Sequence, residues 1–242
     1  MNLCFGLDLG QARDYSALVV TERVHQVANP RPPGETFEDD EPTWQDAYHV
    51  RHTQRWRLGT PYPSVIAEVV ELLQRPELAE ALLVFDRSGV GGAVADLIDR
   101  EWREGRLGGL DGTHLPVGLT FTAGFAPKRG AEGFLDSKTA HKGDVIRRMV
   151  TMLNTGRLLL PPGLPGGEQL EKELRAYTVK QDKRTGYVYT EAKHESDHDD
   201  LVVALALSVW IKNFYGPEPR YVTRDGSLCE KPEGERVYTA AT

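Results

Sequence analysis

The sequence has little cysteine and no long apolar run. Cys4 and Cys229 are the only cysteines and lie far apart along the chain, which argues against a disulfide framework or a cysteine-bound zinc and predicts a reducing compartment. No apolar run is long enough to cross a bilayer, and the N-terminus lacks the basic-then-apolar form of a signal peptide. We therefore expect a globular protein with no membrane partner.

Net positive charge is also missing. The 242 residues carry a formal net charge of −7, which argues against a generally basic nucleic-acid binder. The charge is uneven, because residues 125–193 hold 13 Lys and Arg against 8 Asp and Glu. This local excess is compatible with DNA binding, although charge alone slightly favours an ordinary solvated surface.

Residues 3–24 predict a β-hairpin that carries two carboxylates. An apolar run ends on Asp8, Gly10 follows, and Asp14 precedes the next β-rich run. A charge on a central strand is costly unless it is compensated, and a divalent metal is the usual compensation. Two alternatives remain open: Asp8 could bind backbone N–H groups of the turn, or it could be the phosphate-loop aspartate of an actin-like or sugar-kinase ATPase, which has a similar Asp-x-Gly form.

A second carboxylate follows a second buried strand. The continuous apolar run at residues 81–85 ends on Asp86, and a glycine-containing turn then leads into a helix. Open α/β sheets place their sites at such strand ends. The plainer interpretation is that Asp86 only hydrogen-bonds to its own turn.

A third acidic group opens a late helix. Residues 194–214 are apolar on nearly every face and predict a buried helix, which begins with His198, Asp199 and Asp200. Early carboxylates also suit the helix dipole, which is the structural alternative for these two aspartates. Periodicity does not separate Asp199 from Asp200, and we prefer Asp200 modestly.

The remaining pattern completes a mixed α/β protein. We assign residues 1–214 to one domain and the polar, proline-containing residues 215–242 to a tail or appendage. The predicted elements are strands at 44–58 and 115–122, helices at 64–74, 93–102, 137–154 and 167–177, and a hairpin at 178–194; residues 157–160 form a short apolar run closed by two prolines.

Basic residues gather in the loop, helix and hairpin of the second half. On a protruding hairpin, such residues with tyrosines suit a grip on a nucleic-acid backbone, although a solvated hairpin is an equal alternative. The candidates for DNA binding are Lys128, Arg129, Lys138, Lys142, Lys180, Lys183 and Arg184.

Together, the three acidic signals and the element order match RNase H-like nucleases, with an antiparallel set of three strands followed by parallel strands. Within that group the chain resembles the C-terminal nuclease domain of the large terminase subunit of tailed bacteriophages. The resemblance runs from about residue 3 to residue 212. It is carried by GLDLGQARDYSAL, LLVFDRSGVGG, HDDLVVALAL and the intervening DVIRRMVTMLNTGRLLLPP and LEKELRAYT.

The resemblance implies a metal-dependent endonuclease that cuts concatemeric viral DNA in the cytoplasm of the infected host. It makes Asp8, Asp86 and Asp200 the catalytic, metal-binding carboxylates of a site for two Mg²⁺ or Mn²⁺ ions. Asp14, His198 and Asp199 would be neighbours or auxiliary ligands. Related enzymes carry another acid one helical turn later, where this chain has Val203 or Ala204, so the third ligand must come from the HDD cluster.

The resemblance also implies partners: double-stranded DNA, a packaging ATPase domain, the portal and the small terminase subunit. The sequence lacks a G-x-x-x-x-G-K-[ST] phosphate loop, so we expect the nuclease part alone and no ATP hydrolysis. The alternatives are a Holliday-junction resolvase or transposase-type nuclease, the actin-like ATPase fold, and a non-catalytic DNA-binding module.

Overall fold

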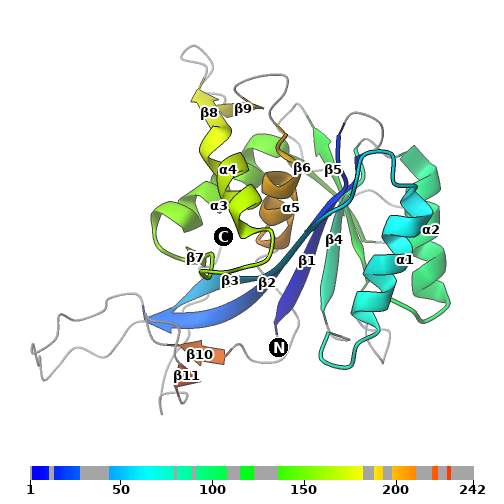
Figure 1. Cartoon of the computed structure of the whole chain (residues 1–242), viewed down its shortest axis with the longest axis horizontal. Coiled ribbons are helices and arrows are strands. Elements are labelled where there is room, and N and C mark those ends of the chain that lie inside the picture. The colour runs from blue at the N-terminus through cyan, green and yellow to red at the C-terminus, as the bar shows by residue number, and fades with distance from the viewer. Residues whose placement is uncertain are drawn as a thin grey trace, which may run out of the picture.

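A curled mixed sheet forms the centre of the protein (Figure 1). The computed structural model describes residues 2–10, 14–27, 44–78, 81–88, 91–107, 115–122, 136–181, 188–192, 198–210, 220–222 and 228–229.

The first three strands are antiparallel and the next ones are parallel, as the sequence predicts. The antiparallel set consists of β1 (Leu3–Asp8), β2 (Ala17–Val27) and β3 (Trp44–Arg55). On the other side of β1, the parallel strands β4 (Leu82–Asp86), β5 (Val117–Thr122) and β6 (Asp136–His141) follow in order. The short β7 (Leu158–Leu159) pairs in parallel with β3. This arrangement is that of an RNase H-like fold.

Helices cover both faces of the sheet (Figure 1). On one side lie α1 (Tyr62–Leu73) and α2 (Gly91–Arg103). On the other side lie α3 (Lys142–Asn154), α4 (Gly167–Ala176) and α5 (Asp200–Ser208). No helix in the described ranges is long and apolar enough to cross a membrane.

Alternation along β1 divides the core into two halves. Leu3, Phe5 and Leu7 pack with α1 and α2, whereas Cys4 packs on the side of α3 and α5. Successive strand residues point to opposite faces, so the even-numbered positions of β1 face α5. Every residue of α5 is buried, which agrees with its apolar sequence.

The segment before α3 differs from the prediction. A helix was expected from residue 137, but Asp136–His141 forms the edge strand β6 and α3 begins at Lys142. All six residues of β6 pair with β5. The ladder supplies backbone partners that an isolated first helical turn would lack, and this tertiary gain outweighs the local helical pattern.

Two further segments of the chain form strands: a separate hairpin and an addition to the edge of the main sheet. The predicted hairpin is present as β8 (Tyr177–Gln181) and β9 (Val188–Ala192), which pair with each other. Part of the expected tail belongs to the main sheet, because β10 (Arg220–Val222) pairs with β2 and β11 (Leu228–Cys229) pairs with β10. The boundary at residue 214 stays a prediction.

Candidate active site

Asp8 and Asp86 lie at the same edge of the sheet. The parallel ladder of β1 and β4 sets Leu7 opposite Phe85. The next residues, Asp8 of β1 and Asp86 of β4, are the last of their strands and therefore lie side by side. Val84 packs in the core half that contains α5. Because side chains alternate, both carboxylates emerge on the α5 face.

A close contact between backbones brings the start of α5 to these carboxylates. A Cβ atom added to Gly6 would overlap the carbonyl oxygen of Ala204 and would lie 2.6 Å from the Ser208 nitrogen. Asp8 follows Gly6 on the same face of β1, and Asp200 precedes Ala204 by one helical turn. Only glycine at position 6 lets α5 approach β1 this closely.

The electrostatics of Asp8 place it within reach of the other acids. Burial raises the pKa of the Asp8 carboxyl well above its usual value, and the nearby Asp86 and Asp200 raise it further. The Lys142 ammonium acts in the opposite direction but is outweighed. Like charges that share a site disfavour the ionised form.

Asp200 is the most buried of the three acids. Its side chain is 4% exposed, and its pKa is raised to about 7 by burial and by the charges of Glu173, Asp199 and Asp14. A hydrogen bond from the Tyr15 backbone N–H opposes this rise. The Oδ2 atom is buried and has no hydrogen-bond partner in the described part of the chain.

The auxiliary candidates surround Asp200. The Nδ1 atom of His198 lies 3.7 Å from Asp200 Oδ2, and the His198 ring stacks edge-on against Tyr15 at 4.6 Å. Asp199 is the N-terminal cap residue of α5 and lies 3.5 Å from the Lys142 ammonium. Asp14 is exposed and sits next to Gly10, whose lack of a side chain lets the two halves of the loop approach.

Asp86 accepts a hydrogen bond from the turn that follows its strand, as the structural alternative for this residue predicts. Its Oδ1 accepts from the Ser88 N–H at 2.7 Å. A carboxylate has about four lone-pair positions, so this bond orients the group without using its full capacity. The turn role and a ligand role are therefore compatible.

Glu173 and Tyr62 also lie at this site, although the sequence does not single them out. Glu173 is buried on α4, and its carboxylate accepts from the Leu201 N–H at 2.9 Å and from Arg55 at 3.0 Å. Tyr62 begins α1; burial raises the pKa of its hydroxyl, and the Asp8 charge adds to the rise. The spacing could have indicated Glu173, because a residue three positions after the buried Leu170 lies on the same face of the helix.

The donor chemistry fits a hard divalent cation. Asp8, Asp86 and Asp200 offer only carboxylate oxygens, which suit Mg²⁺ or Mn²⁺, and the buried Asp200 Oδ2 lacks a hydrogen-bond partner among the described residues. As the side chains stand, no three His, Cys, Asp or Glu residues within the described ranges group closely enough to hold an ion.

The DNA-binding candidates are only partly described. Lys138 lies on the edge strand β6 and Lys142 at the start of α3. The backbone of Lys180 pairs with Tyr189 in the β8–β9 hairpin. Outside the described residues are Lys128, Arg129, Lys183 and Arg184.

Comparison with known proteins supports the fold. No protein-family model and no curated protein sequence matches the chain. Two crystal structures of the large terminase nuclease from thermophilic phage G20c match it with TM-scores of 0.50. The magnesium-bound one is 18% identical and covers 86% of this chain and 79% of that chain. The other is 17% identical, with 86% and 80% covered.

The chain thus has an RNase H-like fold. Within that class, its structural likeness is to the phage large terminase nuclease, as the sequence resemblance predicts.

Proposed function

We propose that this protein is a metal-dependent endonuclease that cleaves double-stranded DNA. The observation that carries the proposal is the convergence of Asp8, Asp86 and Asp200 from β1, β4 and α5 on one sheet edge. The raised pKa of Asp8, caused by burial and then by the other two acids, supports their proximity. A cluster of carboxylates is costly without a counter-ion.

Two Mg²⁺ or Mn²⁺ ions would supply a nucleophilic water and stabilise charge on the phosphate and on the leaving 3′-oxygen. Asp8, Asp86 and Asp200 would hold them, with Asp14, Asp199 and His198 as neighbours or auxiliary ligands. Since these acids do not group tightly as they stand in the described ranges, binding requires side-chain movements that bring them closer together. The Asp200 Oδ2 atom is the best placed, because no hydrogen bond has to be broken to use it.

Lys142 is a cation that lies beside the acids of the site. Burial lowers its pKa, but the charges of Asp199, Tyr177, Asp8 and Asp86 outweigh that effect, so its pKa is raised and it stays protonated. Its side chain is 41% exposed. It can therefore neutralise the acids or meet a DNA phosphate at the edge of the site.

The DNA would be held mainly through its phosphates. Lys142 lies beside the acids, Lys138 is on the edge strand β6, and the further candidates from the sequence are Lys128, Arg129, Lys180, Lys183 and Arg184. Phosphate contacts position a duplex but read no sequence, so we expect little sequence preference and a strong dependence on salt.

The structural likeness suggests a biological setting. The neighbours are large terminase nucleases of a phage, so we propose cleavage of viral DNA concatemers during genome packaging, in the cytoplasm of the infected host. The proposed partners are the packaging ATPase domain, the portal and the small terminase subunit.

DNA substrates distinguish this proposal from its rivals. We expect cutting of linear and supercoiled duplex DNA with Mn²⁺ or Mg²⁺, none with EDTA, and no preference for a four-way junction. A strong preference for the junction would indicate a resolvase instead. Saturable ATP binding in calorimetry would favour the actin-like alternative, and metal-independent DNA binding without cutting would favour a non-catalytic module.

A further inference from the structure

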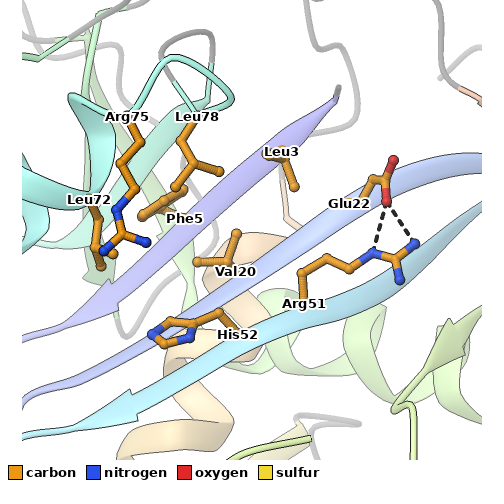
Figure 2. Close-up of a pocket in the computed structure, with 9 residues that line it drawn as sticks. All are labelled: Leu3, Phe5, Val20, Glu22, Arg51, His52, Leu72, Arg75 and Leu78. Atoms are coloured by element: carbon orange, nitrogen blue, oxygen red, sulfur yellow. Dashed lines mark hydrogen bonds and ion pairs between the residues drawn. The ribbon is translucent and has the colours of Figure 1, made fainter.

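A pocket of about 300 Å³ lies on the face of the sheet opposite the acidic site (Figure 2). Its floor is made by Leu3, Phe5 and Val20 of β1 and β2, and its wall by Leu72 and Leu78. Leu3 and Phe5 point away from α5 and pack with α1 and α2. A ligand here would therefore be separated from Asp8 by the sheet itself.

A β-bulge turns two consecutive polar side chains into this pocket. In the ladder of β2 and β3, Val20 pairs with His52 and Thr21 pairs with Val50, so Arg51 is the extra residue. Regular alternation would put Arg51 and His52 on opposite faces, yet both line the pocket. Bulges re-aim side chains in this way next to functional sites.

The polar lining leaves one positive charge in excess. The Arg51 guanidinium is neutralised by Glu22, whose carboxylate is 1% exposed and lies 2.7 Å away. Arg75 also lines the pocket, and no ion pair to its side chain is found among the described residues. Counting His52 as uncharged, the lining carries a net charge of +1, which suits a monoanion.

His52 provides a second recognition point. Its Nε2 atom is buried and has no hydrogen-bond partner in the parts of the chain that the structure describes. Figure 2 shows the Arg75 guanidinium and the His52 ring at one end of the pocket, with the Glu22–Arg51 pair at the other. A buried polar atom without a partner is costly, and a ligand oxygen or nitrogen could satisfy it.

We propose that this pocket binds a small organic monoanion with an apolar body of about two fused rings. Its volume is about twice that of a ~150 Å³ apolar cavity that takes one benzene, and it is at the lower limit of ligand sites in general. The apolar body contacts Phe5, Val20 and the two leucines, and the anionic group meets Arg75 next to His52.

Matched probes test the proposal by calorimetry of the whole chain in EDTA, which prevents metal-mediated binding. The anionic probe is 2-naphthoate, and its neutral counterpart is 2-naphthalenemethanol. We expect one saturable naphthoate site with Kd on the order of 0.1 mM, and binding of the alcohol about tenfold weaker.

Two variants locate the anion. Arg75→Ala should weaken naphthoate about tenfold and leave the alcohol unchanged, because one charge-assisted hydrogen bond is lost. Arg175→Ala, on the exposed face of α4, is the control and should bind like the parent. Arg75 is exposed, so its removal should not affect folding, and thermal melting checks this.

Three results would overturn the proposal. They are the absence of saturable binding at millimolar naphthoate, equal affinity for the alcohol and the anion, and unchanged binding by the Arg75→Ala variant.

Discussion

The backbone of Gly6 on β1 touches the backbone of α5 at Ala204. Two residues after Gly6 comes Asp8, and one helical turn before Ala204 comes Asp200. The same contact therefore fixes both the packing of the most buried helix and the approach of two acids that repel each other. Both the stability of the protein and the geometry of the site therefore depend on the absence of a side chain at Gly6.

Gly6→Ala should destabilise the protein by about 1–3 kcal/mol or more, because the new methyl group meets rigid backbone atoms. Chemical denaturation measures the loss. The matched control is Gly118→Ala on β5, where the new Cβ would lie 3.0 Å from the tip of the Phe85 ring and would meet no backbone atom as closely. Equal, small effects of the two substitutions would contradict the role of Gly6.

The raised pKa of Asp200 predicts a stability that falls with pH in the metal-free protein. The folded state holds a proton on Asp200 up to about pH 7, whereas the unfolded chain releases it near pH 3.9. The stabilising contribution is thus present below pH 3.9 and is lost as the pH rises through 7. The raised pKa of Asp8 acts in the same direction.

Asp200→Asn should remove this penalty. In EDTA at pH 8 the variant should be more stable than the parent by roughly 2–4 kcal/mol, and the difference should shrink toward pH 4. Thermal and chemical unfolding across this range provide the measurement. The exposed Asp144→Asn is the control; it loses only a surface pair with Arg147 and should change stability by less than about 1 kcal/mol at any pH in this range. A variant less stable than the parent at pH 8 would show that Asp200 is not under electrostatic strain.

Much of this arrangement is readable from the sequence, for identifiable reasons. Asp8 and Asp86 stand out because each ends an apolar run, where a charge conflicts with burial. The acidic start of α5 is visible because the following residues are apolar on every face. At each of these positions a charged side chain lies in a segment that its apolar neighbours predict to be buried, and such a conflict predicts a functional site.

Other parts depend on contacts between distant segments. β6 reads as the start of a helix, and only its pairing with β5 makes it a strand. Glu173 reads as one of several charges on α4, and its role emerges only when the α5 backbone donates to it. The bulge at Arg51 cannot be predicted from the sequence either, because it arises from the register in which β2 and β3 pair.

Glu173 should influence the site through both its hydrogen bonds and its charge. Glu173→Ala leaves the Leu201 N–H and Arg55 without their acceptor, so we expect a loss of about 1–3 kcal/mol in the free energy of unfolding. Glu173→Gln keeps an acceptor but removes a charge that raises the pKa of Asp200. That variant should bind Mn²⁺ at lower pH than the parent.

Calorimetric Mn²⁺ titrations between pH 5.5 and 8 measure this shift. Glu171→Gln is the control, because Glu171 lies on the exposed face of the same helix. If Glu173→Gln and Glu171→Gln bind Mn²⁺ with the same pH dependence, the charge of Glu173 does not reach Asp200.

Asp199 and Asp200 should differ in their effect on metal binding. Asp200 is buried, and its Oδ2 atom accepts no hydrogen bond from the described residues, whereas Asp199 pairs with the Lys142 ammonium and its side chain is 35% exposed. We expect Asp200→Asn to lower Mn²⁺ affinity at least about tenfold, and Asp199→Asn to lower it by about threefold or less. A larger loss for Asp199→Asn would reverse the assignment.

The most direct test of the account is plasmid digestion with Mn²⁺, Mg²⁺ or EDTA by the parent, Asp8→Asn and Asp86→Asn, with Asp144→Asn as the surface control. We predict metal-dependent cutting by the parent and the control, and a loss of at least about a thousandfold in the two site variants with unchanged circular dichroism. Cutting by Asp8→Asn and Asp86→Asn at the parental rate would contradict the central claim that these converging carboxylates form the catalytic site.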